Sequence, residues 1–186
     1  TDPQDPHGQP VEFLIDELGF NENEIILSKN KLNPEHLSLL YCVSDCTINI
    51  SDAEGFGLAT LESLSCETPI IVNMTGGLQE QVTDGKNWFG IGIEPTSKAV
   101  IGSQQVPYIY EDRICKEDFH NALLKMYNMP KEEREKLGKL GKEHVDKNYN
   151  FDSFSTQWVN LMTDTYNKHG SWDTRKNHNN FRVEEV

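Results

Sequence analysis

Basic residues are scarce in this sequence of 186 residues: 17 Lys and Arg stand against 30 Asp and Glu, for a formal net charge of -13. Proteins that bind nucleic acid use clustered Lys and Arg to neutralise phosphates, so this charge argues against nucleic acid as the main partner. It also argues against an anionic membrane surface. A nucleotide-sized ligand remains compatible, because backbone N–H groups at a helix start can hold a phosphate without basic side chains.

Paired cysteines and long apolar segments are also missing. The four cysteines include no C-x-x-C pair, so we expect reduced thiols rather than a zinc site. No apolar stretch approaches the roughly 20 residues that span a bilayer, and residues 1–10 lack the apolar run of a signal peptide. We therefore expect a cytoplasmic protein, and the absence of an initial Met leads us to expect a piece of a longer chain.

What is present is an alternation of strand and helix patterns with short connections. Apolar runs predict strands at 24–28, 45–50, 69–72 and 88–93. Helical spacing predicts helices at 10–18, 33–41, 57–66 and 77–82, and Asn33-Pro34 is typical of a helix start. Such alternation predicts an α/β fold: a Rossmann-like parallel sheet with helices on both faces.

The second half of the chain is predicted to be mainly helical. Residues 95–114 look like an irregular insertion, because Pro95, Gly102 and Pro107 interrupt any periodicity. Three C-terminal helices are expected at 116–127, 130–147 and 151–168. We expect one domain over 1–168, followed by a polar tail over 169–186 that is disordered or held by a partner surface.

The last predicted helix, 151–168, carries an apolar stripe. Phe154, Trp158, Leu161 and Met162 recur at helical spacing. The stripe packs either on the domain's own core or on a partner domain, and in the second case we expect self-association.

Residues 49–62, NISDAEGFGLATLE, join a strand end to a helix start through a glycine-containing loop. Ligands of parallel α/β sheets bind at the carboxyl ends of the strands. Gly55 and Gly57 let a ligand approach the backbone closely, and the first helical turn offers N–H groups to a diphosphate. Glu54 precedes the helix, and Glu62 can reach back toward its start. Carboxylates accept hydrogen bonds from neighbouring hydroxyls such as a ribose diol. The spacing alone is equally compatible with a plain strand–loop–helix whose glutamates are solvated.

Several segments in order resemble family 4 of the retaining glycosyltransferases, also called glycosyl transferases group 1. Glu54 and Glu62, with seven residues between them and Gly-Phe-Gly after the first, resemble the family's E-x7-E signature. The flanking segments match in the same order: HLSLLYCVSD at 36–45, ETPIIV at 67–72, TGGLQEQV at 75–82 and DGKN at 84–87. The resemblance implies the C-terminal, donor-binding half of a GT-B fold, followed by C-terminal helices.

The resemblance also implies a role for each matched position. Glu54 would act at the donor sugar as the catalytic-site carboxylate, and Glu62 would bind the ribose. Gly55, Phe56, Gly57 and Leu58 would hold the donor sugar and diphosphate, mainly through backbone N–H groups. Asn30, Lys31 and Leu32 fall where the family cradles the nucleobase, although for Lys31 a solvated side chain is an equal alternative.

The implied function is transfer of a sugar from a nucleoside diphosphate sugar to an acceptor hydroxyl with retention of configuration, by a hexosyltransferase-type enzyme. No cofactor is expected, and metal should be dispensable because no Asp-x-Asp pair lies near the site. The family's N-terminal GT-B domain and the first strand, loop and helix of its donor domain are not in this sequence. That loop carries the basic residues that stabilise the departing diphosphate, so we expect this chain alone to be nearly inactive.

Three other functions are alternatives to this one. A nicotinamide enzyme would need G-x-G-x-x-G after a strand, and here Gly55-Phe56-Gly57 is followed by Leu-Ala-Thr. A sugar-nucleotide epimerase of related architecture would lack the two-glutamate signature. A non-catalytic nucleotide-sugar-binding or interaction module with the same fold remains an alternative.

Overall fold

The computed structural model describes residues 3, 5, 8–21 and 23–176 of the chain. Its helices are α1 (Val11–Glu17), α2 (Pro34–Val43), α3 (Leu58–Ser65), α4 (Leu78–Val82), α5 (Lys116–Asn128), α6 (Lys131–Asn148) and α7 (Phe151–His169). Its strands are β1 (Thr47–Asn49), β2 (Ile70–Asn73), β3 (Gly90–Ile93), β4 (Ser97–Ile101) and β5 (Ile109–Arg113). Helices and strands alternate from α2 to β3, as the sequence predicts.

Three of the strands form a parallel sheet in the order β1–β2–β3. Ile48, Ile71 and Ile91 lie side by side across it. Every residue of β2, the central strand, is buried. A strand covered on both faces has a continuous apolar sequence rather than an alternating one, which is why β2 could be recognised. The predicted parallel sheet is confirmed.

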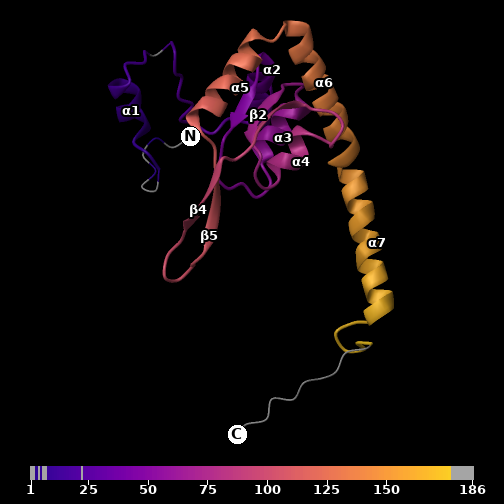
Figure 1. The fold of residues 1–186 in the computed structure, drawn as a ribbon. Coiled ribbons are helices and arrows are strands. Elements are labelled where there is room, and N and C mark those ends of the chain that lie inside the picture. Colours follow the sequence, from indigo (N-terminus) through magenta and orange to yellow (C-terminus); the bar gives the residue numbers. More distant parts are fainter. Residues whose placement is uncertain (1–2, 4, 6–7, 22, 177–186) are drawn as a thin grey trace.

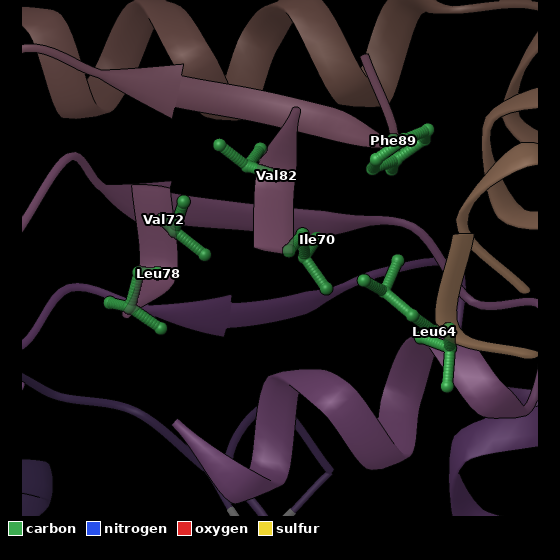
Figure 2. Close-up of a cluster of buried hydrophobic side chains, with 7 residues drawn as sticks. Leu64, Ile70, Val72, Leu78, Val82 and Phe89 are labelled. Atoms are coloured by element: carbon green, nitrogen blue, oxygen red, sulfur yellow. The ribbon is translucent and has the colours of Figure 1, made fainter. Parts of the chain in front are cut away.

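One face of the sheet is covered by α3, α4 and α6 (Figure 1). Leu64 of α3, Leu78 of α4 and Val145 of α6 pack with Ile70 and Val72 of β2 in one buried cluster. Figure 2 shows the β2 side chains of this cluster lying among those of the covering helices. Each such side chain contributes about 1.5–3 kcal/mol on burial, so this cluster is a main source of stability.

The opposite face is covered by α5. Ala122 and Met126 of this helix are buried against Ile71, Ile91 and Ile93 of the sheet. Successive side chains of a strand point to opposite faces, so Ile71 reaches this second cluster while its neighbours reach the first. The prediction of helices on both faces is therefore also confirmed.

The strand predicted at 24–28 is wrong. Residues 24–28 form no strand, and Ile26 is 84% exposed. A strand requires a hydrogen-bonded neighbour, and this segment lies with α1 beside the sheet rather than in it (Figure 1). Helix α1 itself is confirmed, as is the start of α2, where the Asn33 side chain accepts from the His36 amide at 2.8 Å.

The irregular insertion predicted at 95–114 is also wrong, because β4 and β5 pair there as an antiparallel hairpin. Val100 lies opposite Tyr110, and Lys98 opposite Asp112. The residues Gly102 and Pro107, which looked like breakers, lie in the turn that joins the two strands. Gly102 and Pro107 therefore mark the turn at the tip of the hairpin rather than the absence of strands. The hairpin projects away from the rest of the chain (Figure 1).

Helix α7 projects as well, and it does not pack on the domain's own core. It has no buried residue, and it makes no extensive contact with another element of the described chain. Its stripe of Phe154, Trp158, Leu161 and Met162 is exposed over about half or more of each side chain. The alternative of packing on this domain's own core is thus not realised.

The predicted polar tail is described only in part. Helix α7 ends at His169, and residues 170–176 form a turn in which the Lys176 amide donates to the His169 carbonyl at 2.6 Å. The rest of the predicted tail, 177–186, lies outside the described residues. None of the helices in the described ranges combines the length and apolar character needed to cross a membrane.

Candidate functional site

The candidate site is the loop of residues 50–57, between the end of β1 and the start of α3. It lies at the carboxyl edge of the sheet, as predicted. Gly57 caps α3 with φ 88°, a left-handed conformation that favours glycine. A Cβ there would lie 2.6 Å from Cδ2 of Leu78, so glycine is needed for space as well. At Gly55 a Cβ would meet nothing within 4 Å.

The first turn of α3 is open to an anion. No side chain caps it, whereas Asn33, Cys115 and Asn150 cap α2, α5 and α7. Among the helices of the described chain, α3 is also the one whose first turn carries no acidic residue. The amides of Leu58 and its two successors are therefore free of a competing carboxylate, which is what a bound phosphate requires.

A second glycine turn, at residues 76–77, braces this loop. A Cβ on Gly76 would lie 1.7 Å from the Glu54 carbonyl oxygen. The Gly77 amide donates to the Gly55 carbonyl at 3.1 Å. The two backbones therefore touch directly, and the position of the 50–57 loop depends on the absence of side chains at 76 and 77.

Gln81 of α4 also holds the 50–57 loop in place. The sequence analysis did not predict this contact. The Gln81 side chain is fully buried, and Nε2 donates to the Phe56 carbonyl at 2.5 Å. Its Oε1 accepts from the Thr60 hydroxyl at 2.5 Å. A sequence signal did exist: Gln81 is a polar residue beside the apolar Val82 in a short helix. A polar side chain that is buried needs hydrogen-bond partners, so such a position indicates a contact with a neighbouring segment.

Glu54 is half-buried, and one of its carboxylate oxygens is bound by a side chain at the end of β1. Oε2 accepts from Nδ2 of Asn49 at 3.2 Å. The Asn49 Oδ1 in turn accepts from the Ser51 amide at 3.1 Å and the Ser51 hydroxyl at 2.7 Å. Asn49 thus joins the strand end, the loop and the carboxylate, and it limits the directions in which Glu54 can point.

Glu62 is exposed on α3 and is bound by a side chain from another helix. The Tyr41 hydroxyl of α2 donates to Oε2 of Glu62 at 3.1 Å. Burial of the ring, together with this carboxylate, raises the pKa of Tyr41 to about 12. Tyr41 therefore stays protonated and keeps donating at physiological pH. The sequence analysis included Tyr41 within the family-like segment 36–45 and gave it no role at the site.

Phe56 and Leu58 are exposed at the loop and helix start. The Phe56 ring packs edge-on against Tyr149 with 5.9 Å between centroids. Tyr149 contacts His144, which stacks on Phe89 at 4.5 Å. A row of rings thus connects the loop to the core. A cavity of about 710 Å3 lies beside this row, between α4 and α6, and none of the predicted site residues lines it.

The predicted nucleobase residues lie apart from this arrangement. Asn30 and Lys31 are exposed and Leu32 is half-buried, in the segment that leads into α2. No hydrogen bond or ion pair found in the described residues links any of the three to the 50–57 loop. Their role in base binding stays a prediction.

The family model described as glycosyl transferases group 1 matches residues 5–144. The chain belongs to this family. The match includes the 50–57 loop, α3 and the braces that hold them.

Two curated relatives show how much of such a protein the chain represents. It is 29% identical to the alpha-1,3/1,6-mannosyltransferase ALG2 of Dictyostelium discoideum over 149 residues, which are 80% of this chain and 30% of that protein. It is 35% identical to the D-inositol 3-phosphate glycosyltransferase of Corynebacterium jeikeium (strain K411) over 77 residues, 41% of this chain and 18% of that protein. The chain thus spans well under half the length of these relatives.

Among solved structures, the chain resembles sucrose-phosphate synthase from Thermosynechococcus elongatus, with a TM-score of 0.66 and 21% identity. The likeness covers 88% of this chain and 37% of that one. This similarity confirms that the parallel sheet and its helices match part of a GT-B glycosyltransferase fold.

Proposed function

We propose that this chain supplies the donor-binding part of a retaining glycosyltransferase, which moves a hexose from a nucleoside diphosphate sugar to an acceptor hydroxyl. The observation that carries the proposal is the open first turn of α3, without cap or acidic residue, between Glu54 and Glu62. A diphosphate rests on the amides of the first turn, and the two carboxylates accept from hydroxyls on either side of it.

In this arrangement each predicted residue has a separate task. Glu54 accepts from hydroxyls of the donor sugar and is the catalytic-site carboxylate. The backbone from Gly55 to Leu58 binds sugar and diphosphate. Glu62 accepts hydrogen bonds from the ribose hydroxyls. The Tyr41 hydroxyl donates to the same carboxylate and so orients it. Metal is not required in this proposal, because backbone N–H groups supply the positive field that a cation would otherwise provide.

Stabilisation of the departing diphosphate is proposed to come from outside this chain. Arg113 contacts the 50–57 loop, but its guanidinium is already paired with Asp52 and Glu111. Charge stabilisation of this kind is often a large catalytic contribution. We therefore propose that transfer needs the remaining part of a GT-B enzyme and that this chain alone is nearly inactive.

A cytoplasmic location fits the four free cysteines.

Calorimetric titration tests the binding part of this proposal. The chain is titrated separately with uridine diphosphate and guanosine diphosphate. We expect one of them to bind, and Glu62→Gln to weaken that binding about ten-fold, because a hydrogen bond to a charged group contributes about 1.5–3 kcal/mol. Glu80→Gln, an exposed glutamate on α4, is the matched control and should leave the affinity unchanged.

The outcome also separates the two candidate functions. No binding of either nucleotide contradicts the proposal. Binding of the nucleotide sugar by the whole natural protein, with neither transfer nor slow hydrolysis, favours the non-catalytic binding module instead.

A further inference from the structure

The β4–β5 hairpin is attached to the rest of the chain through its base. Its outer part is exposed: Val100 of β4, Tyr110 of β5 and Tyr108 in the turn between them are open to solvent. A two-stranded ribbon is marginally stable by itself, so contacts at the base decide where this hairpin sits. Those contacts fall on the candidate site.

Asp112, at the base of β5, joins two segments that surround the site. Its amide donates to the Asp52 carbonyl at 2.7 Å. Its Oδ2 accepts from the Thr75 hydroxyl at 2.8 Å. Asp52 belongs to the 50–57 loop, and Thr75 opens the glycine turn that braces this loop. One residue of the hairpin thus holds both the loop and its brace.

Two further contacts strengthen the same junction. Nδ2 of Asn73 donates to the carbonyls of Ser51 and Asp112, at 2.9 Å each. Asn73 is fully buried at the end of β2, where a lost hydrogen bond is costly. Arg113 pairs with the Asp52 carboxylate at 2.7 Å, a partly exposed ion pair that contributes less.

The junction acts on one side of the site. Ser51 and Asp52 directly precede Ala53 and Glu54 in the loop. Both Ser51 and the Glu54 carboxylate hydrogen-bond to the Asn49 side chain. Glu62 is instead held by Tyr41, and Gln81 connects the end of the loop to α3 through the Phe56 carbonyl and the Thr60 hydroxyl. The two carboxylates therefore have separate side-chain partners, Asn49 for Glu54 and Tyr41 for Glu62.

We propose that Asp112 is a positioning residue of the donor-sugar subsite: through Asp52 and Thr75, the hairpin holds the loop that aims Glu54. This proposal rests on the proposed function, because it requires Glu54 to contact the donor sugar. It assigns a role to residues 96–114, for which the family resemblance supplied none. Asp112→Ala keeps the main-chain hydrogen bonds to Asp52 and Asn73 and removes the side-chain hydrogen bond to Thr75, so it loosens the turn that braces the Glu54 loop and leaves the Tyr41–Glu62 contact in place.

The test compares ligands with and without the sugar. The chain and its Asp112→Ala variant are titrated with uridine diphosphate, UDP-glucose, guanosine diphosphate and GDP-mannose. For the nucleotide that binds, we expect Asp112→Ala to weaken the nucleotide sugar about ten-fold and the nucleoside diphosphate less than about two-fold. Asp112→Asn keeps an acceptor for Thr75 and should restore most of the lost sugar affinity. Tyr110→Ala, farther out on β5, is the matched control and should change neither.

Amide hydrogen exchange without ligand makes the test independent of nucleotide binding. We expect Asp112→Ala to speed exchange at residues 53–57 and to leave residues 61–65 of α3 unchanged. Equal weakening of both ligands, or unchanged exchange at 53–57, overturns the positioning role. If wild type binds no nucleotide, the proposed function fails and Asp112 loses its role at a sugar, while the exchange result still decides whether the hairpin holds the loop.

Discussion

The parallel sheet with its covering helices α3 to α6, here called the body, and the outer helix α7 both carry apolar side chains. Only the body buries them. Phe89 in the body is 2% exposed, and Phe154 on α7 is 56% exposed. Both belong to segments that sequence patterning identified correctly. The difference teaches that an apolar stripe predicts which side of a helix seeks a partner, but does not predict whether the same chain provides that partner.

The largest expected effect comes from truncating each of these two phenylalanines. Phe89→Ala should lower the free energy of unfolding by about 3–5 kcal/mol, because it leaves a cavity between the sheet and α6. Phe154→Ala should change it by about 0.5 kcal/mol or less, as at other exposed positions. Urea denaturation of the two variants measures both. Similar losses in the two variants would mean that α7 packs on the body after all.

The glycines of the site offer the same contrast between packed and open positions. Gly76→Ala should cost about 1–3 kcal/mol, because φ is 48° and the new Cβ would lie 1.7 Å from the Glu54 carbonyl oxygen. Gly55→Ala meets open space and should be nearly neutral. Thermal unfolding compares them, and a neutral Gly76→Ala would show that the 76–77 turn does not brace the loop.

Exposure of the α7 stripe predicts self-association of the isolated chain. Light scattering behind size exclusion should show an apparent mass that rises with concentration. Trp158→Glu should reduce this association, because it places a charge in the middle of the stripe. Lys168→Glu, at the end of the same helix, is the control and should leave it unchanged. A monomer at all concentrations would contradict the expectation.

The smallest expected effect concerns the surface turn after α4. Backbone hydrogen bonds from Asn87 and Lys86 lower the pKa of Asp84 from 3.8 to about 2. Because the folded-state pKa is the lower one, Asp84 stabilises the fold above about pH 4 and loses this contribution as the pH falls toward 2. NMR titration of the carboxyl carbon measures the pKa directly. A midpoint at the ordinary value would mean that these hydrogen bonds do not hold the turn.

Sequence patterns were sufficient for several elements whose deciding interactions are local, although not for the β4–β5 hairpin. The cap at Asn33, the continuous apolar run of β2 and the glycine before α3 are signals within a few residues, and the structure has each element in place. The strand predicted at 24–28 rested on the same kind of run as β2. It failed because its formation depends on a neighbouring strand, which an apolar run does not reveal.

The contacts that organise the site are distant in sequence and were not predicted. Tyr41 meets Glu62 from another helix, Gln81 reaches the Phe56 carbonyl, and Asp112 reaches Thr75. Each pair needs two elements to be placed by the fold before the side chains can meet. The residues Glu54, Gly57 and Glu62 could therefore be chosen from sequence, but the side chains that support them could not.

The central claim is that a diphosphate binds the amides at the start of α3. Amide NMR spectra of the 15N-labelled chain, recorded during addition of uridine or guanosine diphosphate, test it most directly. The account predicts that the largest shifts fall on Leu58, Ala59 and Thr60, with Glu62 close behind. Shifts confined to the residues around the cavity between α4 and α6, or no shifts with either nucleotide, would contradict it.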